Sequence, residues 1–390
     1  MLTQAQIDIV KATAPVVAEH ANTITATFYP ILFRDFPAVR EVFNQTHQGG
    51  GSQPKALANA VVAFAANIER FDEIKPALRH IIEKHVSLNI SAPQYEAVAV
   101  SLLKAIAEVL GSAVTPEVAD AWGAAFWVLA NFLIGEEDKE YARKAALPGG
   151  WRGARRVKLV QKVKESDIIT SFHFEAADGG DLMDFQPGQF LGLKLTIDGQ
   201  VTHRNYSLSD LPNGRSYRIS VKREPQGHAS GFLHDHLNVG DEIEIYPPSG
   251  EFTLKPGGDI LLITAGVGQT PAIPMVKQAL AEGRKVTYLH AALNSGTHAF
   301  RGAVAALALT NPNLRAVFGY SEPHPEDNPD FTGFITPEIL AEAVGSGSDV
   351  AAYIIGPKPF MRAVIDGLQA LKIPTDRIHY EFFGPAEALA

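Results

Sequence analysis

Cysteine is absent from the 390 residues of this chain. Its absence excludes disulfide bonds, iron–sulfur clusters held by thiolates and a thiolate ligand for haem iron. Any iron that the protein binds must therefore be held by histidine, carboxylate, tyrosine or methionine side chains. The chain also lacks a basic run and carries a formal net charge of −9, so binding to a nucleic-acid backbone is not expected.

Long apolar runs are missing as well. The longest uncharged apolar stretch of helical character covers residues 121–135, which is shorter than the roughly 20 residues that a helix needs to cross a bilayer. The first residues, MLTQAQIDIVKA, lack the cationic segment and the apolar core of a secretion signal. We therefore expect a buried helix at 121–135 and a cytoplasmic protein without a membrane span.

Helical periodicity dominates residues 1–146. Leu57, Val61 and Phe64 fall on one face of a predicted helix, and no segment of this region shows convincing alternation of apolar and polar residues. Thr115, followed by proline, has the character of a cap at the start of a long last helix. This region is predicted to be an all-α domain.

The periodicity changes after a short linker. Proline and glycine turn signals cluster at residues 147–152. Short strands separated by turns at 153–256 predict an antiparallel β-barrel, with a sandwich as the alternative. From 257 to 390, strands alternate with helices, which predicts an α/β domain with a parallel sheet. The predicted fold class is therefore multi-domain, in the order all-α, antiparallel β-barrel and α/β parallel sheet.

A glycine-containing turn opens the third region. The segment TAGVGQTP, residues 264–271, follows an apolar strand and opens a helix that is predicted to start at Pro271. Glycines let the backbone approach a pyrophosphate, and the N-terminus of a helix offers free N–H groups and the positive end of its dipole. The signal is weak alone, because many α/β folds need such a glycine merely to turn.

A second motif, RNYSLSD at residues 204–210, strengthens this interpretation. Alternation along a strand sends Arg204 and Tyr206 to one face, which places a cation for phosphate beside an aromatic ring that can stack on a flavin. A strand-end arginine beside a packed tyrosine is common in isolation. This chain presents the further motifs PGQF (187–190), HAS (228–230), PPSGEF (247–252) and GVGQTP (266–271) in a fixed order.

This order of motifs resembles the ferredoxin–NADP reductase superfamily over residues 153–390. The resemblance implies that the region binds FAD together with NADH or NADPH. The implied contacts to the flavin and its pyrophosphate are Phe190, Arg204, Tyr206, Ser207, Gly227 and Ser230. The implied contacts to the nicotinamide nucleotide are Gly266, Gly268, Gln269, Thr270 and Pro271. The terminal aromatic motif HYEFFGP contains Phe382 and Phe383.

Four positions depart from the usual pattern or leave it open. Phe190 replaces a frequent tyrosine and so removes one hydroxyl contact to the flavin. Ile355 stands where a cysteine beside the nicotinamide is usual, which puts the efficiency of hydride transfer in doubt. Leu293 and Asn294 follow the second strand of the third region, where an arginine would suit NADPH and an acid NADH. The choice between the two nucleotides stays open, with a slight preference for NADH.

An isolated histidine, His85, lies on an apolar helical face of the first region. It follows Ile81 by four residues and Ile82 by three, so the spacing places it on a buried stripe. From spacing alone, a core histidine with satisfied hydrogen bonds is the simpler interpretation, and a metal ligand is the alternative. His234 and His236 are two residues apart and do not share a helix face, so we expect both on the solvated surface.

Four other polar side chains join apolar stripes in the helical region: Tyr29, Gln53, Tyr95 and Glu137. Buried polar groups need hydrogen-bond partners. One apolar cavity that contains a polar ligand would serve all of them together with His85. Each also has an ordinary explanation, because polar groups at helix ends can reach solvent.

These residues resemble the flavohaemoglobin group of bacterial globins, and together with the reductase motifs the match runs through nearly the whole chain. The matching segments are TFYPILF with Tyr29, VFNQ with Phe43, the helix with Gln53 and Leu57, KHVSLNI with His85, PQYEAV with Tyr95, and residues 121–137 with Glu137. The resemblance implies haem b, with His85 as the proximal iron ligand. A carboxylate on its other nitrogen strengthens electron donation, and by resemblance that carboxylate is Glu137, hydrogen-bonded with Tyr95.

The resemblance also implies a distal side. There Tyr29 would donate a hydrogen bond to dioxygen, Gln53 and Leu57 would shape the pocket, and Phe43 would pack against the haem ring. Periodicity alone does not separate Glu137 from its neighbour Glu136. Pro30 follows Tyr29 inside the predicted helix and removes a backbone donor, at a cost of roughly 3 kcal/mol unless the helix is already kinked.

The implied activity is that of a nitric oxide dioxygenase, an NAD(P)H-dependent oxidoreductase that passes electrons through FAD to haem and converts NO and O2 to nitrate. One alternative keeps the same parts but uses O2 itself or lipid hydroperoxides as the acceptor, with lipid in the distal pocket. A second alternative is a haem gas sensor. Against it, the predicted domains use all 390 residues and leave no transmitter or DNA-binding segment. A monomer is expected from the same resemblance.

Overall fold

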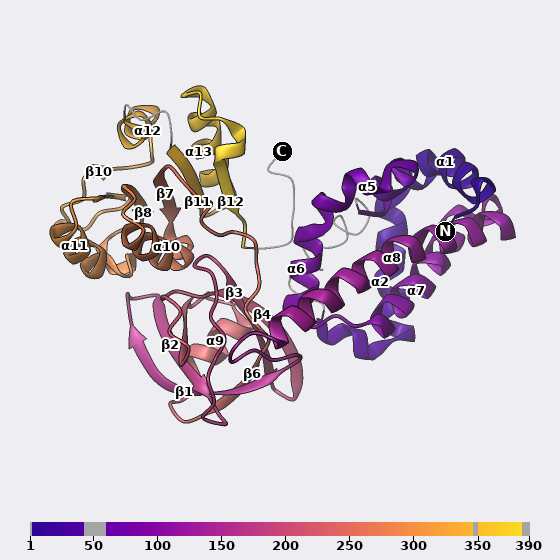
Figure 1. Ribbon diagram of the computed structural model, residues 1–390, viewed down its shortest axis with the longest axis horizontal. Helices are drawn as coiled ribbons and strands as arrows, with labels where there is room; N and C mark the ends of the chain where they lie inside the picture. The colour runs from indigo at the N-terminus through magenta and orange to yellow at the C-terminus, as the bar shows by residue number, and fades with distance from the viewer. Residues whose placement is uncertain (1, 43–59, 346–349, 384–390) are drawn as a thin grey trace.

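The computed structural model describes residues 2–42, 60–345 and 350–383. Within them the chain forms a helical part, an antiparallel β-barrel and a parallel sheet covered by helices, in this order along the sequence. The fold class predicted from the sequence is confirmed. Figure 1 shows the helical part at one end of an elongated molecule and the two β-containing parts at the other.

Helices begin where the sequence supplies capping residues. Thr3 accepts a hydrogen bond from the backbone N–H of Gln6, whose side chain accepts one in return, and Thr115 accepts one from Val118. The elements are α1 (Gln4–Glu19), α2 (Ala21–Asp35), η1 (Pro37–Val42), helical residues 60–66, η2 (Ile68–Arg70), α5 (Phe71–Ile74), η3 (Lys75–Leu78), α6 (Arg79–Ser87), α7 (Ala92–Leu110), η4 (Gly111–Ala113) and α8 (Pro116–Ala145).

Helix α8 contains the expected helix at 121–135. By length and composition it is the one helix of the described residues that could cross a membrane, a test that the core helix of a soluble protein also passes. It packs here along α1, α6 and α7, and its residues Trp122, Ala125 and Leu129 are buried in the core of the helical part. Its apolar character is therefore explained by helix packing.

The barrel is a six-stranded antiparallel sheet with the strand order β4-β3-β6-β1-β2-β5. An isolated bridge between Leu208 and Ile219 joins its two edges, so the sheet closes on itself. Alternate residues such as Leu159, Phe172 and Leu193 fill the interior. The elements are β1 (Arg155–Lys164), β2 (Ile169–Ala176), β3 (Phe190–Ile197), β4 (Gln200–Ser207), β5 (Ser216–Lys222), α9 (His228–Asp235) and β6 (Glu242–Ile245).

The last part is a parallel sheet with the order β10-β9-β8-β7-β11-β12 and an apolar core on each face. Strand order reverses between β7 and β11, and open parallel sheets bind ligands beside such a reversal, at the carboxyl ends of the strands. The elements are β7 (Asp259–Ala265), η5 (Gly266–Gly268), α10 (Gln269–Ala281), β8 (Val286–Ala292), η6 (Ser295–Thr297), α11 (Arg301–Thr310), β9 (Leu314–Tyr320), β10 (Phe331–Thr332), α12 (Pro337–Val344), β11 (Val350–Ile355), α13 (Lys358–Ala370), η7 (Thr375–Arg377) and β12 (Ile378–Glu381).

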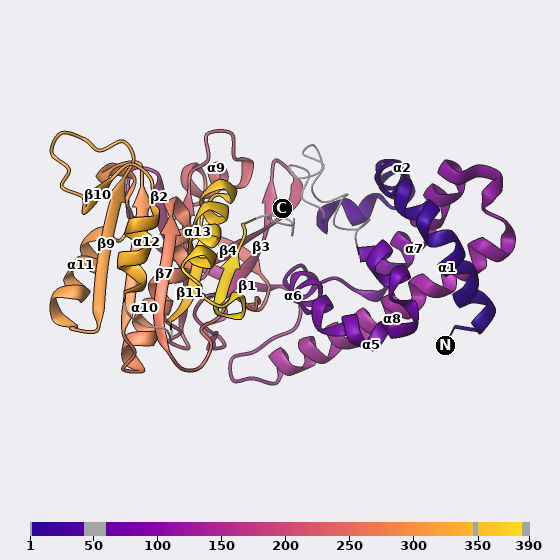
Figure 2. The same cartoon turned by 90° about the horizontal axis from the view of Figure 1, so that it is seen from above.

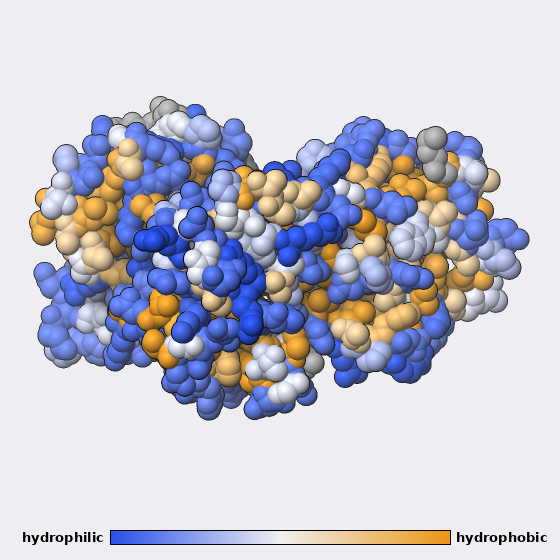
Figure 3. Space-filling view, turned by 60° about the horizontal axis from the view of Figure 1, so that its bottom comes forward, coloured by the Kyte–Doolittle hydropathy of each residue, from blue (hydrophilic) through white to orange (hydrophobic). Residues whose placement is uncertain are grey.

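The helical part meets the barrel through α6. Figures 1 and 2 place this helix on the side of the helical part that faces β3 and β4. Asn205 in β4 donates a hydrogen bond to the hydroxyl of Ser87 in α6 at 3.1 Å. Figure 3 shows the two lobes in contact at a waist, with hydrophilic side chains over most of this face and apolar patches on both lobes.

Candidate functional site

His85 in α6 is the centre of a hydrogen-bond network that joins three helices. Its Nδ1 lies 2.8 Å from the hydroxyl of Tyr95 in α7 and 2.8 Å from Oε1 of Glu137 in α8, and Tyr95 donates to the same Oε1 at 2.5 Å. The structure also resolves the choice between adjacent acids. Glu137 is 2% exposed, whereas Glu136 pairs with Lys139 at the surface.

The partners of Nδ1 determine where the imidazole of His85 carries its proton. A carboxylate can only accept, so Nδ1 bears the hydrogen and donates it to Glu137. In the neutral ring Nε2 is then unprotonated, and within the described residues it makes no hydrogen bond. A carboxylate behind a ligating histidine orients the ring and strengthens its electron donation. These residues therefore fit the axial ligation of a haem iron.

Two buried phenols surround this network. Burial, followed by the nearby charge of Glu137, raises the pKa of Tyr95 far above its usual value. Burial also raises the pKa of Tyr141, whose hydroxyl donates to the carbonyl of Ile90 at 2.8 Å. Both phenols therefore remain protonated at neutral pH and act as hydrogen-bond donors at fixed positions.

Tyr29 is buried in α2, where its ring centroid lies 4.9 Å from that of Phe28 and 5.7 Å from that of Phe33. Burial raises its pKa well above the usual value, so it too remains a neutral phenol. Pro30 lies inside α2, which continues through it to Asp35, so the proline does not end the helix. The other predicted distal residues, Phe43, Gln53 and Leu57, lie outside the described residues.

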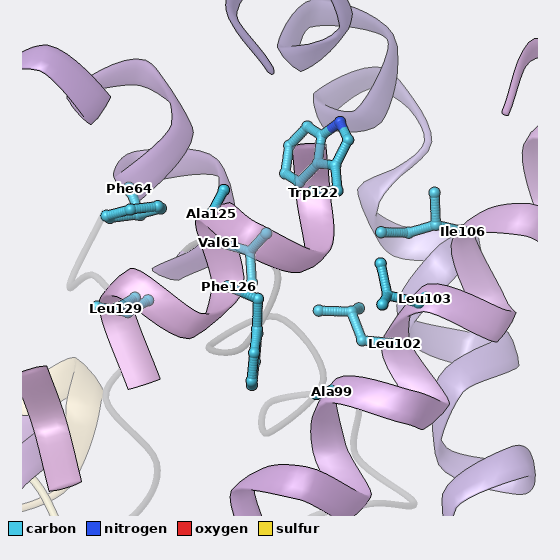
Figure 4. Close-up of a pocket in the computed structure, with 10 residues that line it drawn as sticks. All are labelled: Val61, Phe64, Ala99, Leu102, Leu103, Ile106, Trp122, Ala125, Phe126 and Leu129. Atoms are coloured by element: carbon cyan, nitrogen blue, oxygen red, sulfur yellow. The ribbon is translucent and has the colours of Figure 1, made fainter. Parts of the chain in front are cut away.

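An apolar cavity of about 20 Å³ lies between helical residues 60–66, α7 and α8, as the side chains in Figure 4 show. Nε1 of Trp122 is the one polar side-chain atom of its lining residues, and it donates to Thr13 at 2.9 Å. A cavity of this volume can hold about one molecule of the size of water. The cavity is lined by Val61, Phe64, Ala99, Leu102, Leu103, Ile106, Trp122, Ala125, Phe126 and Leu129.

In the barrel, the predicted flavin residues Arg204, Tyr206 and Ser207 lie on β4, and Ser207 pairs with Phe190 at the start of β3. The guanidinium of Arg204 donates to the carbonyl of His203 at 2.7 Å. Burial lowers the pKa of Arg204, and none of the ion pairs formed within the described residues neutralises it. A partly buried cation without a counter-ion fits a phosphate-binding position.

Gly227 is the N-cap of α9, and Ser230 lies in the first turn of that helix. The hydroxyl of Ser230 accepts a hydrogen bond from the backbone N–H of Glu224 at 3.2 Å and lies 3.2 Å from the carbonyl oxygen of Gly227. A Cβ at position 227 would lie 2.2 Å from that hydroxyl and 2.8 Å from Cβ of Glu224, so a larger residue would displace the Ser230 side chain. Nearby on β4, burial raises the pKa of Tyr206 to about 12, which keeps its phenol neutral. The turn and the first N–H groups of α9 fit the expected pyrophosphate contact.

The predicted nucleotide loop lies beside the reversal of strand order. Gly266 and Gly268 form η5 at the carboxyl end of β7. A Cβ at position 268 would lie 2.4 Å from the carbonyl oxygen of Ile355 at the end of β11, so only glycine allows the loop to press against that strand. The loop therefore lies where open parallel sheets bind nucleotides.

Helix α10 begins at Gln269, two residues before the start expected at Pro271. The difference arises because η5 leads directly into the helix. Thr270 is buried and donates from its hydroxyl to the carbonyl of Val267 at 3.0 Å. Gln269 donates to the carbonyl of Gly266 at 3.1 Å, while its Oε1 is buried without a hydrogen-bond partner within the described chain. An unsatisfied acceptor beside a helix N-terminus fits a ligand that brings its own donor.

The C-terminal motif approaches the junction of α6 and β3. Phe382 is half-buried and Phe383 is 44% exposed. Burial raises the pKa of Glu381 to about 7, and the positive charge of Lys84 opposes this rise. The ammonium of Lys84 lies 5.8 Å from the ring centroid of Phe190. Residues from α6, β3 and β12 therefore converge where the flavin ring is expected.

The expected surface position of His234 needs correction. His234 is not a solvated surface residue: it is half-buried in α9, lies 2.8 Å from the carbonyl oxygen of Val221 through Nε2, and packs against Phe172 with ring centroids 5.6 Å apart. His236 is exposed, as expected. The described part of the chain holds no group of three or more potential metal-binding side chains.

Sequence reasoning missed the polar contacts that join the helical part to the barrel. Glu83 in α6 accepts a hydrogen bond from the backbone N–H of Gly250 at 3.1 Å, and Lys144 in α8 donates to the hydroxyl of Ser249 at 2.6 Å. A signal was present, because Lys144 follows Glu137 by seven residues and so lies on the same helix face.

Comparison with protein families gives three matches that follow one another along the chain. The globin family matches residues 26–133, the oxidoreductase FAD-binding domain matches 156–254, and the oxidoreductase NAD-binding domain matches 262–366. A flavohemoprotein from Pseudomonas aeruginosa is 44% identical over 100% of both chains. One from a Burkholderia species is 45% identical, again over 100% of both chains.

Solved structures give the same result. A flavohemoglobin from Malassezia yamatoensis, determined with bound FAD and heme, superposes with a TM-score of 0.86 at 27% identity, covering 98% of this chain and 100% of that one. The FAD/NAD-binding domain of a nitric oxide dioxygenase from Vibrio cholerae has a TM-score of 0.56 at 36% identity. It covers 60% of this chain and 100% of its own.

Proposed function

Because this chain belongs to the flavohemoprotein family, we propose that it is a nitric oxide dioxygenase, which detoxifies NO by converting NO and O2 to nitrate. The chain is an oxidoreductase that uses haem, FAD and a nicotinamide nucleotide. The observation that carries the proposal is the hydrogen bonding of His85 to Glu137 and Tyr95. His85 lies on α6, the helix that also contacts the flavin barrel. The solved relative from Vibrio cholerae is described as a domain of a nitric oxide dioxygenase.

The proposed reaction is balanced by the nicotinamide. When bound, the cofactors supply the redox chemistry: FAD takes two electrons from NADH or NADPH and releases them singly, and the haem iron activates O2 toward NO. One NAD(P)H, two NO and two O2 then give two nitrate ions, NAD(P)+ and one proton. The residues of the chain bind and orient these groups and keep the protons of the network in place.

On the proximal side, we assign His85 as the iron ligand through Nε2. Glu137 accepts the Nδ1–H of His85, which keeps Nε2 unprotonated and makes the imidazole a stronger electron donor. Tyr95 donates to Glu137 at 2.5 Å and so holds the carboxylate in the orientation that His85 requires. A strongly donating proximal ligand favours the transfer of electron density to dioxygen.

On the distal side, Tyr29 is proposed to donate a hydrogen bond to the gas ligand. The support is its burial, which keeps the phenol protonated. Gln53 and Leu57 are proposed to shape the pocket, and Phe43 to pack against the haem. The apolar cavity lined by Val61 and Phe64 offers NO and O2 a dry space within the helical part.

In the reductase half, the proposed roles follow the two loops and the strand already described. FAD would contact Phe190, Arg204, Tyr206, Ser207, Gly227 and Ser230. The nicotinamide nucleotide would contact Gly266, Gly268, Gln269, Thr270 and Pro271, with Phe382 and Phe383 beside the flavin. We propose domain boundaries at 1–146, 153–256 and 257–390, with 147–152 as the linker. A cytoplasmic location, a monomeric state and a lipid in the distal pocket stay predictions.

The proposal is tested by the consumption of NO by purified protein loaded with haem and FAD, with NADH supplied. We expect fast loss of NO in air, nitrate as the product, and much slower loss without oxygen. Turnover of this kind would also contradict a pure sensor. Slow NO loss under both conditions, while NADH still reduces the flavin, would contradict the proposal and direct attention to lipid hydroperoxides or O2 as acceptors.

A further inference from the structure

Lys144, in the last turn of α8, is almost completely shielded from solvent. Its side chain is 1% exposed, and its ammonium lies 3.7 Å from the carboxylates of Glu83 and Glu140. It donates a hydrogen bond to the hydroxyl of Ser249 at 2.6 Å. Buried lysines are rare, because the loss of hydration must be offset by opposite charges and hydrogen bonds. Here the carboxylates belong to the helical part and the hydroxyl to the barrel, so the ammonium lies at their junction.

Glu83, on α6, completes the same junction. Its side chain is 9% exposed, and its Oε2 accepts from the backbone N–H of Gly250 at 3.1 Å while lying 3.7 Å from the ammonium of Lys144. Ser249 exchanges two backbone hydrogen bonds with Phe190, at 2.9 and 3.0 Å. Phe190 begins β3, so polar contacts run without a break from α6 and α8 to a strand of the expected flavin site.

The C-terminal end of α6 is anchored as well. Ser87 accepts from the side chain of Asn205 at 3.1 Å. A Cβ at Gly192 would lie 2.3 Å from the carbonyl oxygen of Ser87, so the backbone of β3 approaches α6 directly. In sequence, His85 lies between Glu83 and Ser87. The segment that bears the expected iron ligand is therefore attached to the barrel on both sides of that ligand.

We propose that Lys144, Glu83 and Ser249 are positioning residues that lock the helix bearing His85 onto the flavin-binding strands, and so set the rate at which electrons pass from the flavin domain to the haem. This inference rests on the proposed passage of electrons between the cofactors and does not depend on NO as the acceptor. Electron transfer slows steeply as the separation of donor and acceptor grows. A buried ionic cluster suits the task, because any displacement leaves charges unpaired in a poorly solvated interior.

The first test replaces Lys144 by methionine in the full-length protein loaded with both cofactors. Methionine keeps an unbranched side chain of similar length but removes the charge and the donor. The matched control is Lys139→Met on the same helix, where the lysine is 75% exposed and pairs with Glu136 at the surface. After anaerobic mixing with NADH, we expect Lys144→Met to slow haem reduction by about tenfold or more while flavin reduction is unchanged. The control should match the wild type in both steps.

A second readout does not use electron transfer at all. Hydrogen exchange of the loaded protein reports on the backbone amide of Gly250, which donates to Glu83. We expect faster exchange at this amide and along α6 in Lys144→Met, and wild-type exchange in Lys139→Met. This measurement decides whether the helix has been released from the barrel.

The double variant Glu83→Gln with Lys144→Met guards against simple misfolding, because it leaves neither charge unpaired. We expect it to fold and yet to show slow haem reduction and fast exchange at Gly250. Wild-type haem reduction in a folded Lys144→Met protein would overturn the proposal, and so would an equal slowing of flavin reduction. If the wild type itself fails to reduce its haem, the proposed function fails, whereas unchanged exchange at Gly250 in the variants is the result that refutes the locking role.

Discussion

Histidine side chains in two parts of this chain have surroundings that differ in kind: His85 is partly buried, with 29% of its side chain exposed, whereas His290 and His298 are buried. In the helical part, Nδ1 of His85 lies against the carboxylate of Glu137 and the hydroxyl of Tyr95. In the parallel-sheet part, His290 and His298 are buried with their ring centroids 4.4 Å apart. Neither of the latter two has a carboxylate as a hydrogen-bond partner within the described residues.

The partners of the second pair are hydroxyl groups. Nδ1 of His290 lies 2.8 Å from Oγ1 of Thr264, and Nδ1 of His298 lies 3.0 Å from the hydroxyl of Tyr320. Both Nε2 atoms are buried without a partner in the described part of the chain. Burial lowers the pKa of His290 well below its usual value and that of His298 to about 3. These rings are therefore neutral core groups.

The difference teaches that burial alone does not make a histidine a metal ligand. A hydroxyl can donate or accept, so it leaves the tautomer of its partner open, whereas a carboxylate forces the proton onto the nitrogen that faces it. Of the three histidines compared, only His85 has its second nitrogen freed in this way, and only His85 lies on a helix that contacts the flavin barrel. The hydrogen-bond partner of a histidine therefore distinguishes a candidate metal ligand from a core group.

The largest expected effect comes from removing each histidine in turn. His85→Ala should abolish proximal ligation and lower NO turnover by about a hundredfold or more, because the residual activity would rest on binding alone. His290→Ala should leave the absorption spectrum of the ferrous haem unchanged. Spectra of the haem-loaded variants together with NO consumption check both expectations. Retention of the wild-type haem spectrum in His85→Ala would show that His85 is not the iron ligand.

Removing the charge behind the ligand should have the next largest effect. Glu137→Gln keeps the size of the side chain but replaces the carboxylate, and loss of such a supporting group typically costs about 10- to 100-fold in activity or metal affinity. We expect a lower iron–histidine stretching frequency and a higher haem reduction potential. Glu136→Gln is the matched control one residue away, and an identical response of the two variants would show that the buried position of Glu137 is immaterial.

The contact between α6 and the barrel can be loosened by a single methyl group. Gly192→Ala places a Cβ 2.3 Å from the carbonyl oxygen of Ser87, so α6 must move away from β3. We expect haem reduction by NADH to slow by about a few fold to tenfold, with flavin reduction unaffected. The control is Gly302→Ala in α11, where an added Cβ meets nothing within 4 Å. Equal rates in the two variants would mean that close contact at Gly192 is not needed.

The smallest effect concerns stability and belongs to the second histidine pair. Burial lowers the pKa of folded His298 to about 3. The neutral ring therefore contributes fully to the free energy of unfolding above about pH 6.5, the pKa of a histidine in the unfolded chain. That contribution is lost as the pH falls toward 3, by on the order of 1 kcal/mol per pH unit. His298→Gln should therefore show a shallower fall in unfolding free energy between pH 6.5 and about 5 than the wild type. Denaturant unfolding at several pH values measures this slope, and parallel slopes would show that the ring is already solvated.

The fold could be predicted well because its signals are local. Capping at Thr115, strand alternation in the barrel and the glycine loop at 266–268 each act within a few residues, and all were confirmed in place. The start of α10 was wrong by two residues, because η5 continues into the helix without a break. Local sequence signals were therefore sufficient to predict most of the helices and strands and their order.

The site was harder to predict because its decisive contacts join distant segments. Helical spacing could not choose between Glu136 and Glu137. It does not say which of two adjacent residues on α8 faces His85 and which faces the surface. The same spacing, continued seven residues beyond Glu137, reaches Lys144, but its partner Ser249 belongs to the barrel and has no sequence signal of its own. The docking of α6 on β3 and β4 is a property of the tertiary structure alone.

The most direct test of the account follows flavin and haem absorbance in one anaerobic mixing experiment with NADH. The account predicts that the flavin is reduced first and the haem of the same molecule follows, at a rate independent of protein concentration. In Glu137→Gln the first step should be unchanged. Prompt flavin reduction with haem that stays ferric, or haem reduction whose rate rises with protein concentration, would contradict an electron path within the molecule from the barrel to His85.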